Sequence, residues 1–416
     1  VKTLAVGDFQ VNLGQGLLTH SGFGGLKSAQ VMQLKKTGPV LRRYSSVDEN
    51  RFFRGVGLTL APADGWQISA WYARNRRDAN LMQTDSLSFT SLQNSGLHRK
   101  PAEIEDEDAV RLTSLGGNLS FSRHRLKVGL NYLRQHFHLP WTPREQVYNR
   151  FYFRGRRGQN ISLDYHYLWA NLHFFGEMAR SKNGAIASLN GLILSIDQHL
   201  TLGMLHRHLP PHYQALDPNV FAETTRGNNE TGFYFSLECR PSHRWLIAGY
   251  WDRYRHPWPR YQTDGPQRGQ EGRIRITYRE KRKVEVYAEA RHEVKYGQTG
   301  EAPFRQKLTQ LRMHSSYRLS KGLELRSRIN LGWFQNPESR QQGIQLHQDV
   351  IFKPMGYPWH FTGRIALFDT DSYDVRFYNY ENNLLYQQSI PAYYERGIRY
   401  YLNVRYRGIR DLILEL

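Results

Sequence analysis

The 416-residue sequence has a single cysteine, Cys239, and no uninterrupted apolar segment approaching about 20 residues. One cysteine excludes an internal disulfide framework and a metal site made of several thiolates. The missing apolar segment excludes a bundle of transmembrane helices, because a spanning helix needs about that length. Acidic residues are also few, 37 against 57 basic ones, which leaves a formal net charge of +20. This excess predicts an anionic neighbour, whether nucleic acid, lipid headgroups or acidic solutes.

The sequence also lacks an initiator methionine and a charged-then-apolar signal region at its start, Val1. We therefore expect a mature form or an internal fragment, and the missing signal does not argue for the cytoplasm. Aromatic residues, by contrast, make up 13% of the chain. That content is too high for a disordered chain and indicates a folded protein.

Long segments alternate between apolar or aromatic residues and polar ones. Between Gly397 and Gly408 every second residue is apolar or aromatic, and nearly all the others are polar. This period of two puts the two kinds of side chain on opposite faces of a β-strand, whereas a helix would mix them. The pattern recurs at 273–279, 284–291 and 323–333. Segments of about ten residues exceed the usual length of globular strands and are typical of membrane-spanning ones.

The expected connections between these strands are of two lengths. Short turns are expected at 62–65, 122–124, 197–199, 240–243, 280–282, 320–322 and 354–358. Longer polar connections fall between them, at 76–108, 136–148, 208–230, 256–270, 296–303 and 336–343. One more short turn near 168–171 is needed to keep the two kinds in alternation. Outer-membrane barrels show this sorting, with short periplasmic turns and long outer loops.

Together these patterns predict an all-β fold, an antiparallel transmembrane β-barrel of the outer membrane with roughly 16 to 20 strands when complete. We expect a single domain over residues 1–416, with 76–108 and 208–230 as long outer loops. The Gly-rich segment 14–39 does not continue the alternation, and it is expected to fold into the lumen or to form a bent hairpin. Aromatic clusters near strand ends fit interfacial girdles, and hairpin packing in a soluble β protein is the alternative.

Two parts of the chain carry a family resemblance. The motifs are Gly7–Leu17, 22–24 (Gly-Phe-Gly), 27–29, 43–46, 53–55, 368–373, 380–382, 390–394 and 397–401. They resemble the outer-membrane β-barrel region of helix-hairpin-helix domain-containing proteins of Bacteroidota. The resemblance implies a signal-bearing precursor whose helix-hairpin-helix part and first strands precede this sequence, so that N-terminal strands are missing from it. The sequence departs from the family pattern at Glu395, where a small residue is expected, and 412–416 looks like a final strand cut short.

Charged residues on the polar strand faces form the main candidate site. Arginines on one predicted strand lie beside glutamates on the next, where cross-strand pairs contribute roughly 0.2 to 1 kcal/mol each. The set consists of Arg273, Arg275, Arg279, Glu285, Glu289, Arg291, Glu293, Arg326, Arg328, Arg399, Arg405 and Arg407. Two interpretations of this charge ladder remain open. The ladder lines an anion-favouring passage, or it is a structural network that fills the barrel.

Two basic clusters outside this ladder are candidates for contact with an anionic surface. They are Arg154, Arg156 and Arg157, and Lys281, Arg282 and Lys283. Binding to lipid, including the phosphates of lipopolysaccharide, explains their charge without a special substrate and is the preferred interpretation. Nucleic acid is the alternative, because basic groups interleaved with aromatic rings can follow phosphates and stack on bases.

Catalytic and metal-binding interpretations are weaker. His206, His208 and His212 could share a metal ion, but solvated loop histidines are the default because adjacent prolines indicate a loop. His173 with Glu177, and Asp369, Asp371 and Asp374 at an expected tight hairpin, could form a hydrolytic set, yet ordinary turn chemistry explains them. The Gly14–Gly25 segment lacks the phosphate-loop pattern. We expect no enzyme activity and no cofactor.

The sequence therefore predicts a channel or translocation component of the outer membrane. One alternative is a structural or accessory subunit of a larger outer-membrane complex, with a sealed lumen. A second alternative is a barrel for DNA uptake or DNA binding. Expected partners are outer-membrane lipid and lipopolysaccharide, with other outer-membrane proteins and nucleic acid as further candidates.

Overall fold

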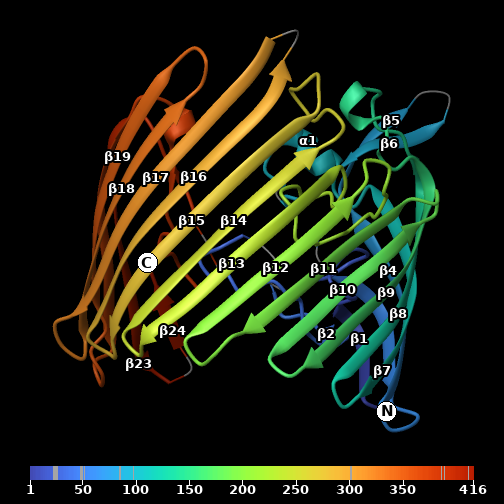
Figure 1. Cartoon of the computed structure of the whole chain (residues 1–416), viewed down its shortest axis with the longest axis horizontal. Helices are drawn as coiled ribbons and strands as arrows, with labels where there is room; N and C mark the ends of the chain where they lie inside the picture. The colour runs from blue at the N-terminus through green and yellow to red at the C-terminus, as the bar shows by residue number, and fades with distance from the viewer. Residues whose placement is uncertain are drawn as a thin grey trace. The chain divides into compact units, whose positions relative to one another are not determined.

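The computed structural model describes residues 1–416 except 22–26, 47–49, 51, 84–85, 97, 300–301, 386, 388 and 411. Gly22, Phe23, Gly24 and Gly25, which belong to the Gly-rich segment, thus lie outside the described residues. Of the described strands, 22 belong to one sheet (Figure 1). The helices found in this part of the chain are short: α1 (Pro101–Glu105), η1 (Val147–Asn149) and η2 (Tyr373–Val375). None of them has the length and apolar character needed to cross a membrane.

The chain divides into two compact units. Unit 1 comprises Val1–Ile196, Leu202–Phe235 and Tyr254–Gln267, and unit 2 comprises Asp197–Thr201, Ser236–Arg253 and Arg268–Leu416. Four strands have residues in both units, namely β12 (Leu200–Leu209), β13 (Glu230–Ser242), β14 (Trp245–His256) and β15 (Gln267–Glu280), of which only Gln267 belongs to unit 1. The other strands are described with the unit that holds them.

Unit 1 is an antiparallel ladder in which neighbours in sequence are mostly neighbours in the sheet. The strand order is β1, β3, β4, β7, β8, β9, β10, β11. The bounds are β1 (Thr3–Val11), β3 (Phe53–Leu60), β4 (Trp66–Arg77), β7 (Val110–Arg123), β8 (Leu126–Trp141), β9 (Gly155–Trp169), β10 (Leu172–Ser181) and β11 (Ile186–Ser195). Shorter strands are β2 (Leu41–Arg43), which pairs with β1, and the hairpin of β5 (Ala79–Gln83) with β6 (Leu87–Leu92).

Unit 2 is a second ladder, in the order β15, β16, β17, β18, β19, β20, β23, β24, whose long strands run side by side in Figure 1. The bounds are β15 (Gln267–Glu280), β16 (Val284–Thr299), β17 (Ala302–Arg318), β18 (Leu323–Gln335), β19 (Arg340–Phe352), β20 (Trp359–Thr370), β23 (Arg396–Ile409) and β24 (Leu412–Glu415). β21 (Phe377–Tyr378) and β22 (Ala392–Tyr393) form a separate small hairpin within the connection 371–395.

The two faces of these strands differ in chemistry in both units. In β15 the side chains of Ile274 and Ile276 are 49% and 41% exposed, whereas Thr277 is buried. In β4 Ile68 and Tyr72 are exposed and Ser69 is buried. We call these the apolar face and the polar face. A sheet of a soluble protein buries its apolar side, so the reverse arrangement over many long strands fits a surrounding of lipid.

All seven expected short turns, and the eighth near 168–171, are confirmed by the strand bounds. The prediction that 296–303 and 336–343 are long connections is wrong. Among the described residues, the ladder continues as far as the pairs Thr299 with Ala302 and Gln335 with Arg340. The expected tight hairpin at Asp369, Asp371 and Asp374 is also wrong, because β20 ends at Thr370 and a connection of 25 residues, 371–395, follows.

Candidate functional site

The polar face of unit 2 carries a network of arginines and carboxylates. The register of β15 on β16 sets Arg275 opposite Glu289 and Arg279 opposite Glu285. The arginine Nε to carboxylate oxygen distances are 2.7 Å and 2.8 Å. Glu289 also lies 3.4 Å from Arg273, so that one buried carboxylate serves two guanidinium groups of β15. Shared carboxylates make this face more basic than a set of one-to-one pairs would.

Other residues of the predicted charge ladder lie in the same network or near its edge. Arg291 bonds Glu271 at 2.9 Å and approaches Glu293 at 3.4 Å. Arg326 bonds Glu324 at 2.6 Å. At the last strands of the unit, Arg399 pairs with Glu381, Arg405 pairs with Glu415, and Arg407 is exposed.

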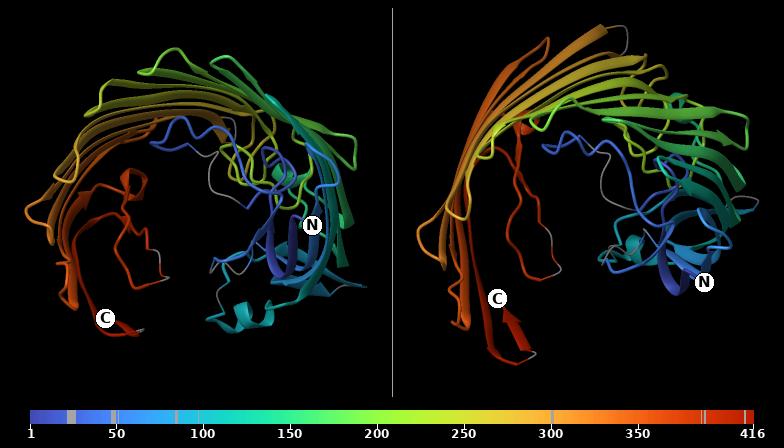
Figure 2. Two further views of the ribbon diagram at one scale, coloured as in Figure 1. Left: turned by 90° about the horizontal axis from the view of Figure 1, so that it is seen from below. Right: turned by 60° about the horizontal axis from the view of Figure 1, so that its bottom comes forward.

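Hydrogen bonds hold the connection 371–395 on the polar face of β18 to β20. Figure 2 shows its irregular backbone, in orange-red to red, beside the strands of unit 2. Arg364 of β20 makes a bidentate pair with Asp349 of β19, at 2.6 Å and 2.8 Å, and donates to the backbone oxygen of Tyr380 at 2.7 Å. Arg328 donates to the side chain of Asn379 at 3.1 Å. This contact between the connection and the polar face has no signal in the sequence, because the partners lie 16 and 51 residues apart.

A cavity of about 400 Å³ on this polar face is dominated by cations. It lies near the short turns β15–β16 and β17–β18. Its basic lining residues are Arg279, Arg282, Lys283, Arg318, Arg326, Arg328 and Arg364, and its acidic ones are Glu280, Glu285, Glu324 and Asp349. Cations therefore outnumber carboxylates around this space, which favours anions in it.

Glu381 gives the connection 371–395 a dependence on pH. Burial alone would raise the pKa of Glu381, but hydrogen bonds from Arg399 and Tyr393 bring that pKa below its ordinary value. A depressed carboxyl pKa stabilises the folded state above the unfolded pKa of about 4.3, and this stabilisation is lost as the pH falls through the folded value. We expect the melting temperature of the wild type to fall more steeply between pH 5 and 3 than that of Glu381→Gln. Parallel acid profiles of the two proteins would contradict this role.

In unit 1 the residues that follow β1 lie on the polar face of β9 and β10. Glu177 of β10, only 1% exposed, accepts hydrogen bonds from the backbone N–H groups of Gln15 (2.7 Å) and Leu17 (3.0 Å) and from the hydroxyl of Ser162 (2.6 Å). Gly14 has a φ of +46°, and a Cβ there would lie 2.5 Å from the Glu177 carboxyl carbon. Glu177 is thus an anchor for this inner segment, and its contact with residues 160 positions away could not be found from spacing.

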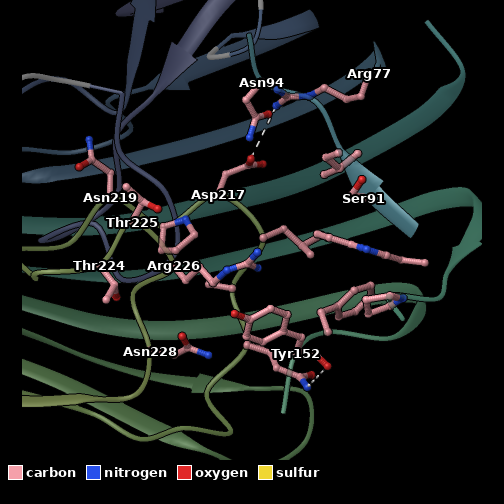
Figure 3. Close-up of a pocket in the computed structure, with 18 of the residues that line it drawn as sticks. Arg77, Ser91, Asn94, Tyr152, Asp217, Asn219, Thr224, Thr225, Arg226 and Asn228 are labelled. Atoms are coloured by element: carbon pink, nitrogen blue, oxygen red, sulfur yellow. Dashed lines mark hydrogen bonds and ion pairs between the residues drawn. The ribbon is translucent and has the colours of Figure 1, made fainter. Parts of the chain in front are cut away.

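A larger cavity of about 1040 Å³ lies at the end of unit 1 that carries the long connections (Figure 3). Arg77 and Asp217 form an ion pair at 3.7 Å across it. The guanidinium of Arg226 lies 4.0 Å from the centre of the Tyr152 ring, and Trp141 adds a further aromatic wall. The cavity therefore offers exposed arginine and aromatic faces where the predicted loops 76–108 and 208–230 approach each other.

The predicted basic clusters lie at strand ends. Arg154 donates to the backbone oxygen of Pro143 at 2.8 Å, and Arg156 and Arg157 are exposed on opposite faces at the start of β9. Lys281, Arg282 and Lys283 are exposed in the turn between β15 and β16. The three residues of each cluster are therefore solvent-accessible, but Arg156 and Arg157 do not form one continuous surface.

The histidines considered for metal binding do not form a ligand cluster. His206 and His208 project from the exposed face of β12, next to the fully buried Arg207. His208 bonds the hydroxyl of Thr231 at 3.1 Å, and the ring of His212 packs against Phe151. Over the described part of the chain, these three histidines are not among the groups whose ligand atoms come close enough to share an ion.

Comparison with known proteins finds no family model and no curated protein that matches the chain. Solved structures do resemble it. The copper transporter OprC is 11% identical with a TM-score of 0.49, over 88% of this chain and 65% of OprC. OmpT of Vibrio cholerae is 6% identical with a TM-score of 0.37, over 83% and 99%. The outer-membrane channel DcaP of Acinetobacter baumannii is 10% identical with a TM-score of 0.36, over 83% and 98%.

The strands of the chain carry the fold assignment by themselves. The strands of the two ladders are antiparallel, and most of them have ten or more residues. They expose isoleucine, leucine, valine and tryptophan, and they bury asparagine, serine and charged groups. That combination is unfavourable in water and favourable in a bilayer, where strands can cross only as a closed sheet without free edges. The chain is an antiparallel β-barrel protein of the outer membrane.

Proposed function

We propose that this protein is a channel of the outer membrane whose polar interior favours anions, and that it has no enzymatic role. The observation that carries the proposal is the cation-rich cavity on the polar face of unit 2, with seven basic and four acidic lining residues. Arg318 and Arg326 both pair with the single carboxylate of Glu324, at 3.5 Å and 2.6 Å. A permeating anion beside these two arginines and their one shared carboxylate would meet net positive charge.

The proposal extends to the surroundings of the barrel. The apolar face would contact lipid. At the end with the long connections, Arg154 and Arg157 would contact lipopolysaccharide phosphates, since Arg157 shares the apolar face of β9 with Ile161, whereas Arg156 lies on the polar face. Lys281, Arg282 and Lys283 lie in a short turn, which in such barrels faces the periplasm. We therefore expect these three residues to meet soluble anions or other outer-membrane proteins instead of lipopolysaccharide.

The test is the ion selectivity of the purified protein in planar bilayers. With a KCl gradient, we expect a reversal potential of the sign that shows chloride preference. The double variant Arg318→Gln with Arg326→Gln leaves Glu324 unneutralised and should move the reversal potential toward cation preference. A matched control is Arg396→Gln. Its side chain is 86% exposed, and it lies at the start of β23, next to the connection 371–395 and away from the short turn near Arg318 and Arg326. Selectivity unchanged by the double variant would contradict the proposal.

The two alternatives predict different results in the same preparation. A sealed accessory subunit would show no conductance although it inserts. A DNA-binding barrel would bind double-stranded DNA with an affinity that falls steeply as salt rises, and neutralising Arg154, Arg156 and Arg157 would remove that binding. Either result would replace the channel proposal.

A further inference from the structure

A second, smaller cavity in unit 1 combines several cations with very little negative charge. It has a volume of about 240 Å³ and lies beside the short turn between β7 and β8. Lys35 comes from the segment between β1 and β2, Lys127 from β8, His166 from β9 and His173 from β10. Four separate parts of the chain therefore bring a basic side chain to one space.

The contacts within this cavity leave positive charge without a counter-ion. The ammonium of Lys35 donates to Nε2 of His173 at 3.2 Å, which uses one of its three hydrogens and adds no negative charge. Among the described residues, neither Lys35 nor Lys127 forms an ion pair within 4.0 Å. The one acidic lining residue is Asp164, whose Oδ2 accepts a hydrogen bond from Asn131 at 2.7 Å.

A buried ring nitrogen at the same place lacks a partner. Nδ1 of His166 is inaccessible to solvent and makes no hydrogen bond within the described part of the chain. The rings of His166 and His173 are 6.0 Å apart, and both residues line the cavity with Lys35. Burial and the positive charge of Lys127 also lower the pKa of Lys35, which shows how unfavourable its own charge is there. Lys35 is half-buried and Lys127 is exposed, so the buried group that calls for a partner here is the His166 nitrogen.

We propose that this cavity binds a tetrahedral oxyanion, inorganic phosphate or sulfate, held by Lys35, Lys127 and His166. The ammonium groups would supply charge-assisted hydrogen bonds, and the tautomer of His166 with its proton on Nδ1 would supply a further donor. Because Lys35 belongs to the inner segment and the other two residues belong to strands, the bound anion would fasten the segment to the polar face. The site does not depend on conduction through the protein.

The test is calorimetric titration of inorganic phosphate, and separately of sulfate, into the detergent-purified protein in chloride buffer at pH 7.5. We expect one saturable site in the wild type. Lys35→Gln should weaken the binding about tenfold or more, since it removes a charge-assisted hydrogen bond. Lys35→Arg should retain binding. The matched control is Lys182→Gln, an exposed lysine in the turn between β10 and β11, outside the cavity, which should bind as the wild type does.

A second variant and a second measurement keep the test decisive if Lys35→Gln folds poorly. His166→Ala leaves the contact between Lys35 and His173 in place and should also weaken phosphate binding. Phosphate should raise the melting temperature of the wild type and of Lys182→Gln, but not of His166→Ala, at constant ionic strength. No saturable binding in the wild type, or equal binding in all variants, would overturn the proposal, whatever the conductance measurements show.

Discussion

Replacing Glu177 by leucine is expected to destabilise the folded protein by about 3 kcal/mol or more. The substitution removes the acceptor of three hydrogen bonds and leaves the N–H groups of Gln15 and Leu17 buried without partners. Each unsatisfied buried group costs about 1 to 3 kcal/mol. The measurement is equilibrium urea unfolding in detergent, followed by tryptophan fluorescence.

Glu177→Gln is the matched control for this prediction. Its amide oxygen can accept from both backbone N–H groups, which donate to the same carboxylate oxygen in the wild type. Its amide nitrogen can donate to the Ser162 hydroxyl, which rotates to accept. We therefore expect the glutamine variant to unfold near the wild-type urea concentration. If the leucine and glutamine variants are equally stable, Glu177 does not anchor the inner segment.

The strands could be predicted because lipid and a polar interior impose a period of two on the sequence. Ile274 and Ile276 alternate with Arg273 and Arg275 whatever the neighbouring strands are. The register of β15 on β16 could also be predicted, because the turn at 281–283 leaves few ways to pair the two strands. The role of these charges in ion passage remains a prediction.

The inner segments could not be predicted in the same way. Residues 371–395 contain aromatic and polar residues without a regular period, and they are positioned by distant partners such as Arg328. A sequence shows that such a segment leaves the sheet, but not which face it covers. Glu395 is informative in this respect: it has a φ of +62°, a conformation that glycine adopts more readily, at the position where the family resemblance implies a small residue.

Glu177 illustrates the same limit for the site. In the sequence it is a glutamate two positions from Phe175 in a strand, and a hydrolytic set with His173 was one interpretation of it. The structure instead gives it three hydrogen-bond donors, and it places His173 against Lys35. Long-range contacts of this kind depend on where the chain returns after β1, which local patterns do not encode.

Breaking the pair of Arg364 and Asp349 is expected to have an effect as large as that of Glu177→Leu. The two side chains are 5% and 3% exposed, and Arg364 also donates to the backbone oxygen of Tyr380. Asp349→Leu would leave an uncompensated buried guanidinium, and Arg364→Met an uncompensated carboxylate. Removing one partner of a buried pair costs about 3 to 5 kcal/mol. Urea unfolding of each variant measures this loss.

The double variant, Asp349→Leu with Arg364→Met, separates the cost of an orphaned charge from the value of the pair. With both charges gone, no buried ion is left unpaired, so the double variant should be more stable than either single variant. The exposed pair of Arg396 and Asp369, at 3.0 Å in the same unit, is the control. Arg396→Met should change the stability by no more than about 1 kcal/mol. If the losses of the two single variants simply add up in the double variant, the two charges do not stabilise each other, and the prediction is contradicted.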